Sequence, residues 1–98
     1  MVPGDRRADS RKIAQAAGSR SARIAGSEEV AEATGFEPGA VAPFPLPRVE
    51  RLFIERTLLS HHVVWIGAGS DKHMAALAPA ELVRLSRARP MDVVELHA

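Results

Sequence analysis

The sequence has no cysteine and no long apolar segment. Without cysteine, the chain can form no disulfide bond, no thiolate metal site and no cysteine nucleophile. The longest strongly apolar run, residues 63–66, is far shorter than the roughly 20 residues that span a bilayer. The N-terminus also lacks the apolar core of a secretory signal. We therefore expect a cytoplasmic protein that has no membrane partner.

The residues that are present suffice for one small core. The chain has 98 residues, of which 46% are hydrophobic, and a chain of this length buries about 60 to 65% of its unfolded surface. It contains no internal repeat and no low-complexity tract. We therefore expect residues 1–98 to form a single domain of marginal stability.

The charges are unevenly distributed along the chain, although the net charge is only +1. Residues 1–26 carry six basic and two acidic side chains, a net charge of +4, whereas residues 27–98 carry seven basic and ten acidic ones, a net charge of −3. A basic segment can bind nucleic acid because neutralised phosphates release counterions. A solvated helix face is the alternative explanation. The nucleic-acid candidates are Arg6, Arg7, Arg11 and Lys12.

Local signals predict three helices and four short strands. Each helix starts at a capping residue or a proline and stops at a glycine or a proline. The boundary pairs are Asp9 or Ser10 with Gly18, Ser27 with Gly35, and Pro79 with Pro90. The strand candidates are residues 22–25, 51–57, 62–66 and 91–96.

The order of these elements predicts the fold class. Helices and strands alternate along the chain, which is typical of an α/β or α+β domain. The run at residues 63–66 is continuously apolar, which predicts a strand buried on both faces. Trp65 lies in this run, so we expect it to pack in the core.

Residues 35–46 form the most informative segment of the chain. They are too rich in glycine and proline for regular structure and too apolar for a solvated loop. Gly39 permits a positive φ and the close approach of a ligand or another backbone segment. Pro43 fixes its own φ and biases Ala42 toward an extended conformation. We therefore expect an ordered loop that presents backbone amides at fixed positions.

Further motifs accompany this loop in a specific order. Thr34 precedes it, and segments 55–59, 64–70 and 88–93 follow it. Together they resemble the YbaK-type aminoacyl-tRNA deacylases, which are relatives of the editing domain inserted in bacterial prolyl-tRNA synthetases. The similarity runs from about residue 2 to residue 95. It implies a mixed, barrel-like sheet with helices around it.

The resemblance also implies an activity and a site. The reaction is hydrolysis of the ester that joins a wrong amino acid to the terminal adenosine of tRNA. The loop backbone would hold the aminoacyl end and orient a water molecule, and the turn at residues 67–70 would line the pocket wall. The implied catalytic residues are Gly39 and Asp92, and the implied substrate-binding residues are Gly39, Ala40, Val41, Ala42, Pro43, Gly67, Ala68, Gly69 and Ser70.

Residue patterns alone leave simpler explanations open for two of these features. The turn at residues 67–71 lacks the third glycine of a dinucleotide fingerprint, because position 72 is Lys72. Ser70 is not at the centre of a Gly-x-Ser-x-Gly elbow. The alternative is a tight turn that ends a strand. For Asp92 the alternative is a solvated carboxylate on an edge strand.

The four histidines do not form a metal-binding pattern. His61 and His62 are adjacent, so in a strand their side chains would point to opposite faces. His73 and His97 have no acidic or histidine partner at helical spacing. We expect no metal and no cofactor.

One family feature has no match in this sequence. Family members carry further elements upstream of a segment like residues 3–7, and one of these elements bears a lysine important for activity. This chain begins after that point, and neither Lys12 nor Lys72 matches that lysine. We therefore expect the C-terminal portion of the domain, which deacylates slowly or not at all, whereas a version extended upstream through a lysine-bearing strand should recover activity.

Two functions follow from this interpretation. The first is deacylation of aminoacyl-tRNA in trans, with an aminoacyl-tRNA synthetase as a further candidate partner. The second is a catalytically silent remnant that binds tRNA or a protein. In either case a sheet edge without a neighbouring strand would promote self-association.

Overall fold

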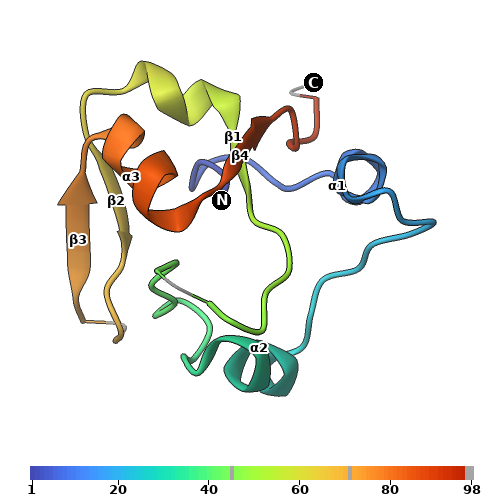
Figure 1. Ribbon diagram of the computed structural model, residues 1–98, viewed down its shortest axis with the longest axis horizontal. Coiled ribbons are helices and arrows are strands. Elements are labelled where there is room, and N and C mark those ends of the chain that lie inside the picture. The colour runs from blue at the N-terminus through green and yellow to red at the C-terminus, as the bar shows by residue number, and fades with distance from the viewer. Residues whose placement is uncertain (45, 71, 97–98) are drawn as a thin grey trace.

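The computed structural model describes residues 1–44, 46–70 and 72–96, which form a mixture of short helices and strands (Figure 1). Pro45 of the expected loop, Asp71 of the expected turn and His97 lie outside the described residues. In chain order the elements are α1 (Ser10–Ala17), α2 (Ser27–Thr34), β1 (Phe53–Glu55), the 3₁₀ helix η1 (Arg56–Ser60), β2 (Val64–Gly67), β3 (Met74–Leu77), α3 (Pro79–Ser86) and β4 (Arg89–Met91).

The first two helices have the boundaries expected from their capping residues. The Asp9 carboxylate accepts the backbone N–H groups of Arg11 and Lys12 at the start of α1. Gly18 ends α1 in the left-handed conformation, with φ of 69°, and Gly35 ends α2 in the same way. Local chemistry therefore decides where α1 and α2 begin and end.

The end of α3 differs from the prediction. Pro79 starts this helix as expected, but the helix stops at Ser86, because Arg87 adopts a left-handed conformation with φ of 57°. Pro90 lies in β4 and does not close the helix. That prediction is wrong because the chain has already left the helix before it reaches the proline.

The strands form two separate pairs. β1 pairs with β4 in parallel, with Ile54 opposite Pro90, and β2 pairs with β3 in antiparallel fashion, with Trp65 opposite Ala76. The mixed α+β class is confirmed, but the described residues form no closed barrel. Strands of three or four residues in two unjoined pairs cannot close a sheet on itself.

Three strand predictions need correction. Residues 22–25 pair with no strand among the described residues, and Ile24 is 90% exposed. Of the strand expected at residues 51–57, only residues 53–55 form a strand, β1. Residues 56 and 57 already belong to η1. The strand expected at residues 91–96 is reduced to the end of β4 and an isolated bridge between Ala8 and Val94. β3 was not predicted, because its Met-Ala-Ala-Leu sequence has little strand propensity.

β2 is not buried on both faces. Val64 is 8% exposed, whereas the neighbouring Trp65 is 66% exposed. The prediction that Trp65 packs in the core is therefore wrong. A two-stranded sheet covered on one side buries alternate residues only, and periodicity in the sequence does not reveal whether a second layer is present.

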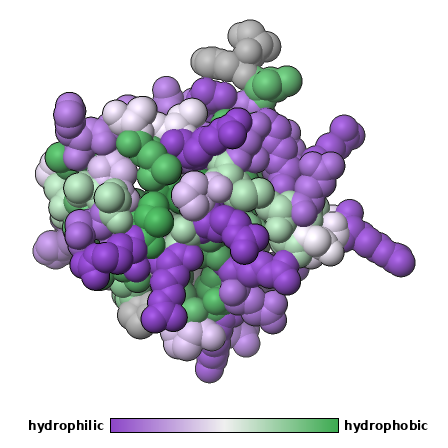
Figure 2. Space-filling view, turned by 45° about the horizontal axis from the view of Figure 1, so that its top comes forward, coloured by the Kyte–Doolittle hydropathy of each residue, from purple (hydrophilic) through white to green (hydrophobic). Residues whose placement is uncertain are grey.

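The core lies where α3 packs between the two strand pairs (Figure 1). Its buried cluster joins Ile54 of β1, Val64 of β2, Leu82 of α3 and Ala88. Elsewhere, many hydrophilic side chains surround scattered apolar ones on the face shown in Figure 2. The core thus fixes β2 and α3 relative to each other, and the candidate site is built on these two elements.

One buried carboxylate connects the β1 end to the C-terminal segment. Glu55 is 1% exposed, and its two oxygens accept the backbone N–H groups of Thr57 and Val93 at 2.9 and 3.0 Å. Burial by itself would raise the pKa of Glu55, but these two hydrogen bonds outweigh it and hold the pKa below its usual value. Glu55 therefore links segments that are 38 residues apart.

Candidate functional site

The glycine-proline loop and the turn after β2 lie against each other. A Cβ atom on Gly67 would lie 2.6 Å from the carbonyl oxygen of Val41 and 3.1 Å from its nitrogen. The backbone N–H of Gly69 donates to the carbonyl of Ala40 at 3.0 Å. Two segments singled out by the sequence are therefore in direct backbone contact, and only a glycine fits at position 67.

Gly39 has a different role from Gly67. Its φ of 85° is in the left-handed region, which confirms the expected positive φ. A Cβ atom on Gly39 would meet no heavy atom within 4 Å, and the residue is exposed. In the described part of the chain, another backbone segment therefore comes close to Gly67 and not to Gly39. Gly39 allows the backbone to turn. Among the described residues, no acceptor takes the N–H of Gly39 or of Ala42.

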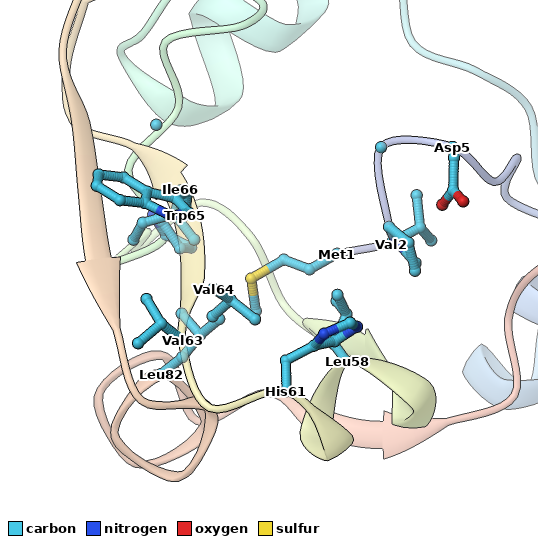
Figure 3. Close-up of a pocket in the computed structure, with 14 residues that line it drawn as sticks. Met1, Val2, Asp5, Leu58, His61, Val63, Val64, Trp65, Ile66 and Leu82 are labelled. Atoms are coloured by element: carbon cyan, nitrogen blue, oxygen red, sulfur yellow. The ribbon is translucent and has the colours of Figure 1, made fainter.

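A cavity of about 480 Å³ opens beside this contact (Figure 3). It follows the edge of β2 that no other described strand covers, since all four residues of β2 and the preceding Val63 line it. Its remaining wall comes from the N-terminal segment, from Leu58 and His61 around η1, from Pro43 and from Leu82 of α3. The cavity is therefore mostly apolar, with strand backbone along one side.

Only part of the expected substrate-binding set lines this cavity. Pro43 and Gly67 do, whereas the other expected positions do not line it. Sequence reasoning missed residues 1–5 and His61, which the fold brings to the cavity from distant parts of the chain. The roles assigned to the expected residues stay predictions.

The N-terminal segment is held beside β1 by backbone hydrogen bonds. The Met1 amino group donates to the carbonyl of Phe53, and the Met1 carbonyl accepts the N–H of Glu55. Burial lowers the pKa of this amino group. The Met1 side chain then extends toward Val64, whereas Asp5 lies at the upper right of the view, away from β2 (Figure 3). No local pattern at residues 1–5 indicates this arrangement.

Asp92 lies at a different hollow, beside Lys12 and Arg56. The Lys12 ammonium binds both oxygens of Asp92, at 2.9 and 3.0 Å, and also donates to the carbonyl of Val94. The hydrogen bond from Lys12 holds the pKa of Asp92 below its usual value, and partial burial opposes this effect. The carboxylate is therefore paired, and it does not line the cavity. Its expected catalytic role stays a prediction.

The basic candidates near the N-terminus differ in their availability. Arg7 and Arg11 are exposed, whereas Arg6 donates to the carbonyl of Glu95. The Lys12 charge is already balanced by Asp92. Arg7 and Arg11 are therefore better placed to contact a phosphate than Lys12.

Comparisons with known proteins agree on one family. Residues 1–85 match the family described as an aminoacyl-tRNA editing domain. The uncharacterized protein YwhH of Bacillus subtilis (strain 168) is 34% identical over 86 residues, which are 88% of this chain and 54% of that protein.

Two solved structures have a similar fold. A proposed trans-editing enzyme for prolyl tRNA synthetase is 31% identical, with a TM-score of 0.85 over 95% of this chain and 59% of that one. The hypothetical protein APE2540 is 36% identical, with a TM-score of 0.84 over 96% of this chain and 63% of that one. The chain thus spans about half the length of its curated relative and about 60% of these structures.

No helix in the described part of the chain is long and apolar enough to cross a membrane.

Proposed function

We propose, because this chain belongs to the aminoacyl-tRNA editing domain family, that it hydrolyses the ester bond of mischarged aminoacyl-tRNA in trans. The observation that carries the proposal is the backbone contact between the 39–43 loop and the end of β2, at the rim of an apolar cavity. We also propose that the chain works as one domain and acts in the cytoplasm.

The site suits this reaction because ester hydrolysis needs positioned donors more than acidic or basic side chains. Water adds to the ester carbonyl, and the tetrahedral intermediate carries negative charge on the former carbonyl oxygen. Backbone N–H groups of the loop, such as that of Ala42, would stabilise this oxygen. The intermediate then collapses to the free amino acid and the ribose hydroxyl of the terminal adenosine.

Cavity size would select the amino acid. Its lining is largely apolar and includes Leu58, Val64 and Leu82, so a side chain too large for it is excluded by steric overlap. A missing methylene is discriminated only weakly, by about 1 to 3 kcal/mol. The apolar lining therefore favours an apolar amino acid side chain, and a panel of mischarged tRNAs would identify which amino acids are hydrolysed.

A pair of glycine variants tests the loop. Gly39→Ala and Gly18→Ala each place an alanine at a positive φ, 85° and 69°, and in each case the added Cβ atom meets no heavy atom within 4 Å. Each should lower the free energy of unfolding by about 1 to 2 kcal/mol, the cost of a left-handed alanine. Only Gly39→Ala should also lower the deacylation rate, by about tenfold, because it changes the presentation of loop amides.

The measurements are urea unfolding and single-turnover deacylation of a mischarged tRNA. Equal deacylation rates for Gly39→Ala and Gly18→Ala would show that the loop is not part of the site. If both the wild-type chain and a version extended upstream bind tRNA but hydrolyse no mischarged substrate, the silent tRNA-binding alternative replaces the enzyme.

Two partners follow from the proposal. Aminoacyl-tRNA is the substrate, and Arg7 and Arg11 would contact its backbone, with Arg6 and Lys12 contributing less because of their existing bonds. An aminoacyl-tRNA synthetase that produces the mischarged tRNA is a second partner.

Self-association is expected through the exposed face of the β2–β3 pair. Trp65 and Met74 share this face, since Met74 lies opposite Gly67, and Val63 continues it. These three side chains are 66%, 55% and 51% exposed, and contiguous apolar surface favours association. Met74→Lys should lower the self-associated fraction in sedimentation velocity, whereas Ile24→Lys, at an exposed site outside this face, should not. A monodisperse wild-type monomer at all concentrations would refute this expectation.

A further inference from the structure

A second hollow differs from the cavity in the charge of its lining. This groove has a volume of about 780 Å³. The two hollows have no described lining residue in common, but neighbouring residues line them: Pro43 lines the cavity and Phe44 the groove, and Leu82 lines the cavity while Leu85, one turn further along α3, lines the groove. The 39–43 loop region and α3 therefore contribute walls to both hollows.

Basic side chains surround the groove. Arg51, Arg87 and Arg89 line it together with one acidic residue, Glu50, so its charged side chains have a net charge of +2. Arg51 donates to the carbonyl of Ala17 at the end of α1. Among the described residues, Arg87 and Arg89 form no salt bridge. Two guanidinium groups are therefore open to an anionic partner.

The floor of the groove is apolar and partly aromatic. Phe44 and Phe53 line it with Leu52 and Leu85, and Leu85 is 44% exposed. Planar guanidinium groups bind phosphate oxygens, and aromatic rings stack with nucleobases. A groove that combines the two features matches a single strand of nucleic acid better than an acidic peptide, which has the charges but no bases to stack.

We propose that this groove binds a single-stranded segment of RNA, with phosphates on Arg87 and Arg89 and a base against the apolar floor. The assignment rests on the proposed function: if the aminoacyl end of a tRNA enters the cavity, the nucleotides that precede this end run along the groove. The groove then supplies affinity for the part of the substrate that does not react.

The test uses a fluorescein-labelled single-stranded RNA of about 12 nucleotides, a length comparable to known single-strand sites. Its binding to the whole chain is followed by anisotropy over a range of salt concentrations. Arg87→Gly and Arg89→Ala should each weaken binding about fivefold and reduce the slope of log K against log salt by about 0.7. Arg84→Ala, which removes one positive charge outside the groove, should change neither quantity.

The variants also separate binding from folding. Arg87 has a positive φ, so Arg87→Gly should melt at or above the wild-type temperature while it binds RNA more weakly. Unchanged RNA affinity and salt slope in both groove variants would overturn the proposal. A poly-glutamate peptide that binds as tightly as the RNA, with the same dependence on Arg87 and Arg89, would also overturn it.

Because the probe carries no amino acid, the outcome is independent of the editing reaction. RNA binding that depends on the groove, in a chain that deacylates nothing, would contradict the enzyme and leave the groove assignment intact. If the chain deacylates mischarged tRNA but its RNA affinity does not depend on Arg87 or Arg89, the enzyme is supported and the groove assignment is overturned.

Discussion

Gly67→Ala should nearly abolish deacylation and strongly destabilise the fold. Gly67 does not have a positive φ, so alanine fits its backbone conformation and the whole effect comes from steric overlap. The added Cβ atom would lie 2.6 Å from the carbonyl oxygen of Val41, which is backbone and cannot rotate away. Overpacking of this kind costs about 1 to 3 kcal/mol, and the loop must move away from β2 to relieve it.

The displaced loop should reduce activity more than stability. Misplacement of positioning groups by about 1 Å can cost about a hundredfold in rate. Gly26→Ala is the matched control, because the nearest atom to its added Cβ is the Glu29 carboxylate at 3.6 Å, an ordinary contact. Urea unfolding and single-turnover deacylation of both variants give the comparison. Near-wild-type activity in Gly67→Ala would show that the loop contact does not form the site.

Glu55→Gln should lower the free energy of unfolding at pH 7 by about 2 to 3 kcal/mol, the cost of a buried polar group left without its partner. The carboxylate accepts from Thr57 and Val93 through both oxygens, whereas a glutamine amide presents one acceptor and one donor group. One buried N–H therefore loses its acceptor and faces another donor. The loss should loosen the junction between η1 and the C-terminal segment.

The same residue should control acid stability. The folded-state pKa of Glu55 lies below the usual value of 4.5, so below that pH the unfolded chain binds more protons than the folded chain. The stabilisation is therefore complete above pH 4.5 and is lost as the pH falls through the folded-state pKa. Glu55→Gln should flatten this part of the stability curve.

Urea unfolding between pH 3 and 7 measures the effect. Glu81→Gln is the control: Arg84 also lowers the pKa of Glu81, but the pair is exposed and contributes little to stability. If Glu55→Gln keeps the wild-type acid profile, another group is responsible for the loss of stability in acid.

Local chemistry made several features readable from the sequence alone. Asp9 and Gly18 marked the ends of α1 because a carboxylate satisfies free N–H groups and glycine tolerates a left-handed conformation. Gly39 was recognised as a positive-φ position for the same reason. The order of motifs along the chain indicated the editing-domain family, which the match to residues 1–85 confirms.

Features that depend on what covers a segment could not be predicted. Trp65 was expected in the core because its neighbours are apolar, but only the tertiary structure shows that the described residues leave β2 uncovered at Trp65, which is 66% exposed. The strand expected at residues 22–25 has no partner in the described part of the chain, since pairing requires a neighbouring strand that local propensity does not supply.

The candidate site shows the same division. The sequence by itself determined which segments are unusual, namely the 39–43 loop and the turn after β2, because glycine and proline have local backbone signatures. Only the tertiary structure decided that Gly67 lies against Val41, that residues 1–5 line the cavity and that Lys12 pairs with Asp92, 80 positions away. These contacts are set by how the whole chain packs, and no local pattern contains that information.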